Sequence, residues 1–180
     1  MQWPNNILKY IIGFAVSILI RLIPFRPPNV EPIMATTMPF AKKWGYLAGF
    51  FFAALSIILY DLLHPSSGFV RIGLWTWITA ILYGLIGIAS AWYFQRQKET
   101  KQIHYVGFAV VMTLIYDALT GLILSPYLFG MTFAQAFFGQ IPFTLNHLLG
   151  NIVFAYCISP FLYDWIVNNK QLELSTIKEK

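Results

Sequence analysis

Two groups of polar side chains in the second half of the chain have the types and the spacing expected of a ligand-binding site. One group recurs at i, i+4 and i+7 and the other at i, i+3 and i+7, so each would share one face of a helix. The groups are Thr113, Asp117 and Thr120, and Thr144, His147 and Asn151. They offer a carboxylate, an imidazole and an amide to the polar edge of a ligand. The alternative for Asp117 is a buried pair with Arg21, Arg26 or His147.

Further polar and aromatic side chains stand where the expected helices begin or end. Asn29 and Glu31 precede a short apolar run, and Trp75 and Trp77 begin a longer one. The amide and the carboxylate would contact the polar edge of a ligand, whereas the indoles would stack on a flat heterocycle. The alternative for the aromatic residues is a belt at the membrane interface. The expected connecting loops, or positions next to them, carry Arg26, His64, Arg71, Tyr127 and Phe129.

The common catalytic and phosphate-binding motifs are absent from the sequence. It contains no His-Glu-x-x-His, no Gly-x-Ser-x-Gly, no Cys-x-x-Cys and no glycine loop of the kind that cradles phosphate. We therefore expect a protein that is not an enzyme and that takes any energy for transport from elsewhere. Cys157 is the single cysteine, so an intrachain disulfide cannot form.

The composition is that of an integral membrane protein. Hydrophobic residues make up 58% of the 180-residue chain and charged residues 11%, against roughly 45–50% and about 25% in globular domains. So few charged side chains cannot coat a soluble surface. Because a spanning helix needs about 20 residues, this length allows about five to seven membrane helices and no sizeable soluble domain.

The apolar runs predict an all-α bundle of six membrane helices in one domain, residues 1–180. The second run is short, which predicts a tilted half-buried helix or a re-entrant segment. The expected helices cover residues 7–23, 29–40, 44–63, 72–94, 103–124 and 141–167. Ser125-Pro126 is expected to end the fifth helix, and residues 129–140 are expected to form a separate interfacial helix. Residues 168–180 are expected to be a polar cytoplasmic tail.

The positions of Lys and Arg predict the orientation of the bundle in the plasma membrane. With both termini in the cytoplasm, nine of the 12 basic residues lie inside, which is the positive-inside pattern. The nine are Lys9, Lys42, Lys43, Arg96, Lys98, Lys101, Lys170, Lys178 and Lys180. The net charge of +5 therefore requires no nucleic acid as a partner. In this orientation the polar residues crowd toward the outer leaflet, which predicts a pocket open to the outside and not a continuous pore.

Small residues recur every four positions on three of the expected helices. The stripes are Gly13 and Ser17; Gly45, Gly49 and Ala53; Ala80 and Gly84; and Gly87 and Ala91. Such stripes let helix backbones approach closely, and for most of them we expect internal packing.

A set of short segments along almost the whole chain resembles one family of membrane proteins. The segments are 21–33 (RLIPFRPPNVEPI), Tyr60-Asp61, Trp75-Thr76, Tyr116-Asp117, Pro142-Phe143-Thr144, His147, Gly150 and Asn151. In these motifs, and in the expected helix number and topology, the chain is similar to the S components of energy-coupling factor (ECF) transporters.

The resemblance implies a subunit that captures a small heteroaromatic vitamin or a related micronutrient from outside. In that family the substrate enters between the loops after the first, third and fifth helices, so the resemblance implies gate residues in or near these loops: Arg26, His64, Arg71, Tyr127 and Phe129. It also implies a transmembrane coupling subunit and two ATPase subunits, which hydrolyse ATP to drive uptake. The first helix of the family often carries an Ala-x-x-x-Ala patch that docks on the coupling subunit, and the nearest match here is Gly13-x-x-x-Ser17. Nickel and cobalt members have a histidine close after the initiator methionine, whereas Met1-Gln2-Trp3 has none. The resemblance therefore implies no metal, and no covalently bound cofactor is expected.

Two other classes of protein remain open from the sequence. A stand-alone facilitator or small channel would need polar residues through the inner half of the bundle as well. A structural or assembly protein of the membrane would explain the small-residue stripes, but it would leave the outer clustering of polar side chains as coincidence.

Overall fold

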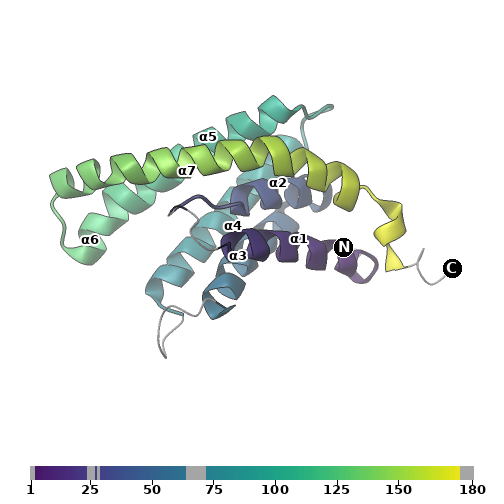
Figure 1. Ribbon diagram of the computed structural model, residues 1–180, viewed down its shortest axis with the longest axis horizontal. Helices are drawn as coiled ribbons and strands as arrows, with labels where there is room; N and C mark the ends of the chain where they lie inside the picture. The colour runs from purple at the N-terminus through teal and green to yellow at the C-terminus, as the bar shows by residue number, and fades with distance from the viewer. Residues whose placement is uncertain (1–2, 24–26, 28, 64–71, 175–180) are drawn as a thin grey trace.

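The fold comes from a computed structural model, which describes residues 3–23, 27, 29–63 and 72–174 (Figure 1). The described residues form helices joined by short connections, with no β-strand among them, as the sequence predicts. The α-helices are α1 (Trp3–Arg21), α2 (Ile33–Trp44), α3 (Tyr46–Leu63), α4 (Leu74–Phe94), α5 (Gln102–Asp117), α6 (Ser125–Phe129) and α7 (Phe133–Phe161). Two π-helical segments, η1 (Ala118–Leu124) and η2 (Leu162–Val167), continue α5 and α7, and η3 (Lys170–Leu172) is a 3-10 turn.

Four helical segments are long and apolar enough to cross a membrane, which is consistent with a membrane protein. They are Tyr46–Leu63, Leu74–Phe94, Gln102–Phe129 and Phe133–Val167. Of the two other long helices, α1 contains Lys9 and Arg21, and α2 has 12 residues. Six apolar passes therefore do not follow from helix length and composition.

The bundle has two distinct ends. At the end that we call the basic end, Lys42, Lys43, Gln95, Lys98 and Tyr163 surround a surface hollow. The start of α1 lies there beside the segment after η2, and Figure 1 shows the first turns of α1 on the same side of the molecule as η3. From this end α1, α3 and α5 run to the opposite end, and α2, α4 and α7 run back.

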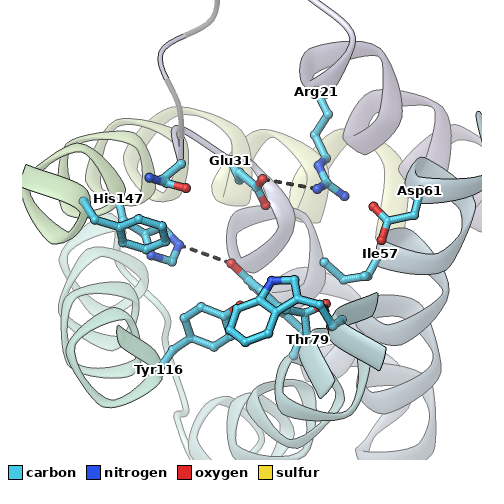
Figure 2. A pocket seen from close by; sticks show the side chains of 11 residues that line it. Arg21, Glu31, Ile57, Asp61, Thr79, Tyr116 and His147 are labelled. Carbon is cyan, nitrogen blue, oxygen red and sulfur yellow. Dashed lines mark hydrogen bonds and ion pairs between the residues drawn. The ribbon is translucent and has the colours of Figure 1, made fainter. Parts of the chain in front are cut away.

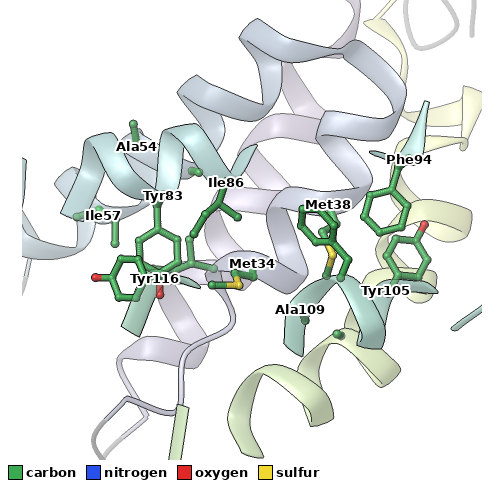
Figure 3. Packing of buried hydrophobic residues seen from close by; sticks show 14 of the residues in the cluster. Met34, Met38, Ala54, Ile57, Tyr83, Ile86, Phe94, Tyr105, Ala109 and Tyr116 are labelled. Atoms are coloured by element: carbon green, nitrogen blue, oxygen red, sulfur yellow. The ribbon is translucent and has the colours of Figure 1, made fainter. Parts of the chain in front are cut away.

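Helix α2 lies at the centre of the bundle. Its nine residues from Ile33 to Ala41 are all buried, because α3, α4 and α7 pack around it. Figure 3 shows Met34 and Met38 of α2 among side chains of α3, α4 and α5. The sequence predicted a short second helix, and this is confirmed. The expected half-buried position is wrong, since the other helices enclose α2.

Helices α3 and α4 approach each other closely at two glycines. A Cβ atom on Gly49 or on Gly87 would overlap the backbone carbonyl group of the other residue. The stripes Gly45-Gly49-Ala53 and Gly87-Ala91 are therefore internal packing surfaces, as expected. Without side chains at these two positions, backbone meets backbone along this contact.

The helix boundaries between residues 124 and 141 differ from the prediction. The helix continues through Ser125-Pro126 to Phe129, because Pro126 occupies the first turn of α6, where its missing N–H is tolerated. Gly130 then adopts a left-handed conformation (φ 64°) and ends α6. Helix α7 begins at Phe133 and runs without a break through Ile141. The separate interfacial helix at 129–140 is therefore wrong.

The start of α7 is defined by a capping box. The Thr132 hydroxyl accepts a hydrogen bond from the Gln135 backbone N–H (3.3 Å), and the Gln135 side-chain oxygen accepts one from the Thr132 backbone N–H (2.9 Å). This is the Thr-x-x-Gln pattern of a helix N-terminus, which the sequence contains and which would have placed the boundary correctly.

The basic end is held together by a buried lysine. Lys9 is 1% exposed, and its ammonium group donates to the Val167 carbonyl (3.1 Å) and to the Glu173 carboxylate (2.9 Å). This ion pair joins α1 to the segment after η2. Sequence reasoning used Lys9 only as evidence for orientation.

Replacing Glu173 by glutamine is expected to lower the free energy of unfolding by about 1 kcal/mol, because a buried ammonium group loses its anionic partner while the partner itself is partly solvated. The hydrogen bond from Lys9 lowers the pKa of Glu173 from its ordinary value. The stabilisation is therefore present above the unfolded-state pKa and is lost as pH falls through the lowered folded-state pKa. Thermal unfolding in detergent, from neutral to acid pH, measures both effects.

The matched control is Glu99→Gln, which removes an exposed carboxylate in the connection between α4 and α5. It is expected to leave the unfolding temperature at neutral pH unchanged. An equal loss in the two variants would contradict a specific role for the Lys9–Glu173 pair.

Candidate functional site

A cavity of about 210 Å³ lies at the end of the bundle opposite the basic end. Five helices and the segment before α2 contribute its lining. The lining residues are Arg21, Asn29, Glu31, Ile57, Asp61, Trp75, Thr79, Tyr83, Tyr116, Phe143 and His147. At about 30 Å³ per water molecule, the cavity has room for about seven waters or for one small ring system.

One side of the cavity carries the charged groups. Figure 2 shows Arg21, Glu31 and Asp61 grouped there, across the cavity from His147 and Tyr116. The Arg21 guanidinium donates to the Glu31 carboxylate (3.2 Å) and lies over the Tyr60 ring, 3.6 Å from its centroid. The Asp61 carboxylate accepts a short hydrogen bond from the Thr76 hydroxyl (2.6 Å). The C-terminal ends of α1 and α3 thus meet the first turn of α4.

The opposite side carries a hydrogen-bonded chain of three residues from three helices. His147 Nδ1 lies 2.8 Å from Asp117 Oδ1, and His147 Nε2 lies 3.2 Å from the Tyr83 hydroxyl. Because a carboxylate only accepts, Nδ1–H donates to Asp117, and Nε2 of a neutral imidazole can accept from Tyr83. His147 and Asp117 are each 2% exposed. Of the partners that the sequence left open for Asp117, the structure selects His147.

A second polar contact lies one helical turn deeper. The Asn151 amide nitrogen donates to the Thr113 hydroxyl (2.8 Å), which donates in turn to the Ala109 carbonyl (2.7 Å). Asp117 Oδ2 and Asn151 Oδ1 are buried and have no hydrogen-bond partner among the described residues. Thr113 and Asp117 of one predicted stripe therefore face Asn151 and His147 of the other in the interior of the bundle.

The interior beyond this level is closed by apolar side chains. The core cluster continues from Tyr83 and Tyr116 past Met34 and Met38 to Phe94, Tyr105 and Phe108 at the other end (Figure 3). Rings of Phe94 and Tyr105 are stacked with centroids 4.8 Å apart. Within the described chain, the cavity is therefore separated from the basic end by packed hydrophobic residues.

The segment before α2 is positioned by two backbone features. Asn29 has a positive φ of 66°, a left-handed conformation that asparagine tolerates better than most residues. Gly150 of α7 lies directly against this segment, because a Cβ there would come within 2.8 Å of the Val30 Cα atom. The close approach brings Asn29 and Glu31 to the cavity, opposite Phe143 and His147 of the same helix α7.

A second hollow, of about 310 Å³, lies on the other side of the His147–Asp117 pair, between η1 and α7. Asp117, Gln140 and Thr144 are its polar lining residues, and the rest of its lining is apolar. The Gln140 side chain donates to the Thr144 hydroxyl (3.2 Å). Thr144 therefore faces this second hollow and not the cavity at the bundle end.

The structure brings only part of the predicted site together. Asn29, Glu31, Trp75 and His147 line the cavity. Asp117 and Asn151 lie behind it, bonded to His147 and to Thr113. Trp77, 50% exposed, does not line it.

The predicted gate residues are only partly covered by the described chain. Tyr127 and Phe129 are 86% and 63% exposed, and the Phe129 ring lies 5.9 Å from the Trp75 ring. Phe129 thus adjoins the cavity through Trp75. Arg26, His64 and Arg71 lie outside the described residues.

The expected docking surface on the first helix faces inward. A Cβ on Gly13 would overlap the Phe40 ring of α2, and Ser17 is fully buried. Neither residue is available to a partner subunit, so the assignment of Gly13 and Ser17 to docking is corrected to internal packing of α1 against α2 and α3.

Several lining residues were missed as site residues, and one feature of the sequence could have found two of them, Thr79 and Tyr83. Thr76, Thr79 and Tyr83 recur at i, i+3 and i+7, which gives α4 a polar face of its own. Asp61 was noted only as part of the Tyr60-Asp61 motif of the family resemblance. Arg21 was used for orientation and as a candidate partner of Asp117, whereas its partner is Glu31.

The side chains that line the cavity combine hydrogen-bonding groups with aromatic rings. They provide carboxylate and imidazole hydrogen-bonding groups beside the ring faces of Trp75, Tyr83, Tyr116 and Phe143. No group of three or more His, Cys, Asp or Glu side chains in the described parts of the chain could hold a metal ion. No family model, curated protein or solved structure matches this chain.

Proposed function

We propose that this protein is the substrate-capture subunit of a micronutrient uptake transporter, similar in role to the S component of an ECF transporter. The observation that carries the proposal is the cavity of about 210 Å³ at one end of the bundle, with hydrogen-bonding groups beside aromatic rings. Such a combination is typical of pockets for small molecules, in which rings supply contact area and a few polar groups fix orientation. The ligand is a small molecule with a flat ring.

The closed interior supports capture over conduction. A channel needs a hydrated path through the bundle, and here the core cluster of Met34, Met38, Phe94, Tyr105 and Phe108 fills the space below the cavity. A bundle that binds at one end and is packed at the other must move as a whole, or work with partner subunits, to release its ligand inside. A coupling subunit and two ATPases would supply that step, with ATP as the energy source.

The charges support an orientation with the cavity outside. Lys42, Lys43 and Lys98 lie at the basic end, which would face the cytoplasm under the positive-inside rule. Helices α1 and α2 also run between the two ends, so the chain would pass through the bilayer six times with both termini inside. Helix α2, enclosed by its neighbours, would make its pass without contacting lipid.

Purification in mild detergent, followed by mass spectrometry, is expected to recover a small heteroaromatic ligand. Once identified and labelled, the ligand should bind to right-side-out membrane vesicles and not to sealed inside-out vesicles. Replacing Tyr116 by leucine removes the ring that lies edge-on to His147 (centroids 5.6 Å apart), and we expect it to weaken binding by about 1–3 kcal/mol.

The matched control is Tyr156→Leu, an equal change at an exposed position of α7 away from the cavity. It should bind the ligand like the wild type. Ion flux in vesicles without any co-purified ligand would favour a channel. If neither a co-purified ligand nor ion flux is observed, the result would favour a structural protein.

A further inference from the structure

The described charged side chains that line the cavity include more carboxylates than cations. Among the described lining residues, the Arg21 guanidinium accompanies two carboxylates, Glu31 and Asp61. Arg21 is bonded to Glu31, and the described hydrogen-bond partner of Asp61 is the neutral hydroxyl of Thr76. His147 adds no net positive charge, because Asp117 lies against it and would neutralise a protonated ring. The described lining therefore carries one carboxylate in excess.

Of the charged side chains that line the cavity, the two carboxylates are more accessible to a ligand than the guanidinium group. The side chain of Arg21 is 6% exposed, and its Nε and Nη1 atoms are buried, with no hydrogen-bond partner among the described residues. The Glu31 side chain is 20% exposed, and Asp61 is half-buried. An anionic ligand would have to displace Glu31 or Tyr60 to reach the guanidinium, whereas a cationic ligand meets carboxylate oxygens at the surface of the cavity.

The walls also suit a cation. Trp75, Tyr83, Tyr116 and Phe143 surround the space, and the face of an aromatic ring attracts a cationic group. The protein already uses this interaction once at this end, where Arg21 lies over Tyr60. Carboxylate oxygens and ring faces together are the chemistry that recognises organic cations.

We infer that the ligand captured by this cavity is a small aromatic cation, whose charged group lies between Glu31 and Asp61 and whose ring lies against Trp75 and Tyr116. The inference rests on the proposed capture function and adds the charge class of the ligand. It names the acidic side of the cavity as the determinant of specificity.

Three isosteric probes test the charge class directly. Benzamidine, benzamide and benzoate share one size and shape and are cationic, neutral and anionic at neutral pH. Their affinities are measured by calorimetry on the protein in nanodiscs of phosphatidylcholine, whose zwitterionic surface does not itself concentrate cations. We expect benzamidine to bind at least about tenfold more tightly than benzamide, a difference of about 1.4 kcal/mol, and benzoate to bind most weakly.

Two variants locate the effect. Asp61→Asn should abolish most of the preference for benzamidine over benzamide, because it removes the excess negative charge while the asparagine oxygen can still accept from Thr76. Asp164→Asn removes an exposed carboxylate at the basic end and should change neither affinity. If Asp61→Asn does not fold, Glu31→Gln and the wild-type probe series still decide the question.

The failures of the two proposals are distinguishable. Equal affinities for benzamidine and benzamide, or tightest binding of benzoate, would overturn the cation inference and leave capture standing. A neutral or anionic co-purified ligand would do the same. Absence of binding by all three probes, together with absence of any co-purified molecule, would overturn both.

Discussion

Replacing Asp117 by alanine is expected to lower the free energy of unfolding by about 1–3 kcal/mol, because the Nδ1–H of the buried His147 ring loses its acceptor. The variant leaves the buried His147 ring, 2% exposed, without the carboxylate that lies 2.8 Å from Nδ1. It also removes the link between α5 and α7 at the level of the cavity. Reversible unfolding in detergent, followed by tryptophan fluorescence, measures the change.

The matched control for Asp117→Ala is Asp164→Ala, which removes an exposed carboxylate from η2. Its expected effect is within about 0.5 kcal/mol of zero, as for surface substitutions in general. Asp117→Asn should fall between the two, because its amide oxygen can still accept from Nδ1–H. Similar stabilities for Asp117→Ala and Asp164→Ala would contradict a structural role for the pair.

The second large effect is expected at the contact between α3 and α4. Gly87→Ala places a methyl group on the backbone carbonyl of Gly49, so the two helices must move apart. We expect a loss of about 1–3 kcal/mol in the free energy of unfolding, as for other overpacked interiors. Gly87→Leu should prevent the normal contact altogether.

Gly107→Ala is the matched control, because a Cβ atom at this position of α5 has open space around it. Alanine there should stabilise the protein by up to about 1 kcal/mol through its higher helix propensity. Glycine-to-alanine substitution is thus expected to lower the free energy of unfolding at Gly87 and to raise it at Gly107. An equal loss of stability in both variants would show that the close contact of Gly49 and Gly87 does not determine the effect.

These two predictions concern different kinds of helix contact. Between lipid-exposed helices the hydrophobic effect gives little net attraction, so close packing of small residues and hydrogen bonds between polar residues hold the bundle together. Gly49 and Gly87 provide the first, and Asp117 and His147 provide the second. The second contact also forms one wall of the cavity, which joins the stability of the bundle to the shape of its site.

Local sequence patterns predicted well those features that depend on the sequence of a single helix. The all-helical fold, the short second helix and the shared faces of Thr113-Asp117 and His147-Asn151 follow from apolar run length and helical periodicity. The error at residues 125–141 is also local, because the Thr132–Gln135 capping box and the left-handed Gly130 carry the boundary. A closer reading of turn and cap residues would have removed it.

The pairing of side chains from different helices could not be predicted in the same way. Asp117 had three candidate partners, Gly13 and Ser17 resembled an outer docking patch, and Trp77 resembled a lining residue as much as Trp75 did. Each choice depends on how a helix is rotated about its axis and on which neighbour it meets. Rotation is set by packing over the whole bundle, which residues distant in sequence determine together.

The sequence by itself determined that the chain is apolar, helical and basic at one end, because composition, run length and charge position are properties of single segments. The tertiary structure alone decided that Arg21 pairs with Glu31, that His147 pairs with Asp117, and that Asp61, among the described residues, accepts from the neutral hydroxyl of Thr76 beside a cavity. The charge of the site depends on these three pairings. They arise only when five helices and the Asn29–Glu31 segment converge, and no periodicity within one helix encodes that convergence.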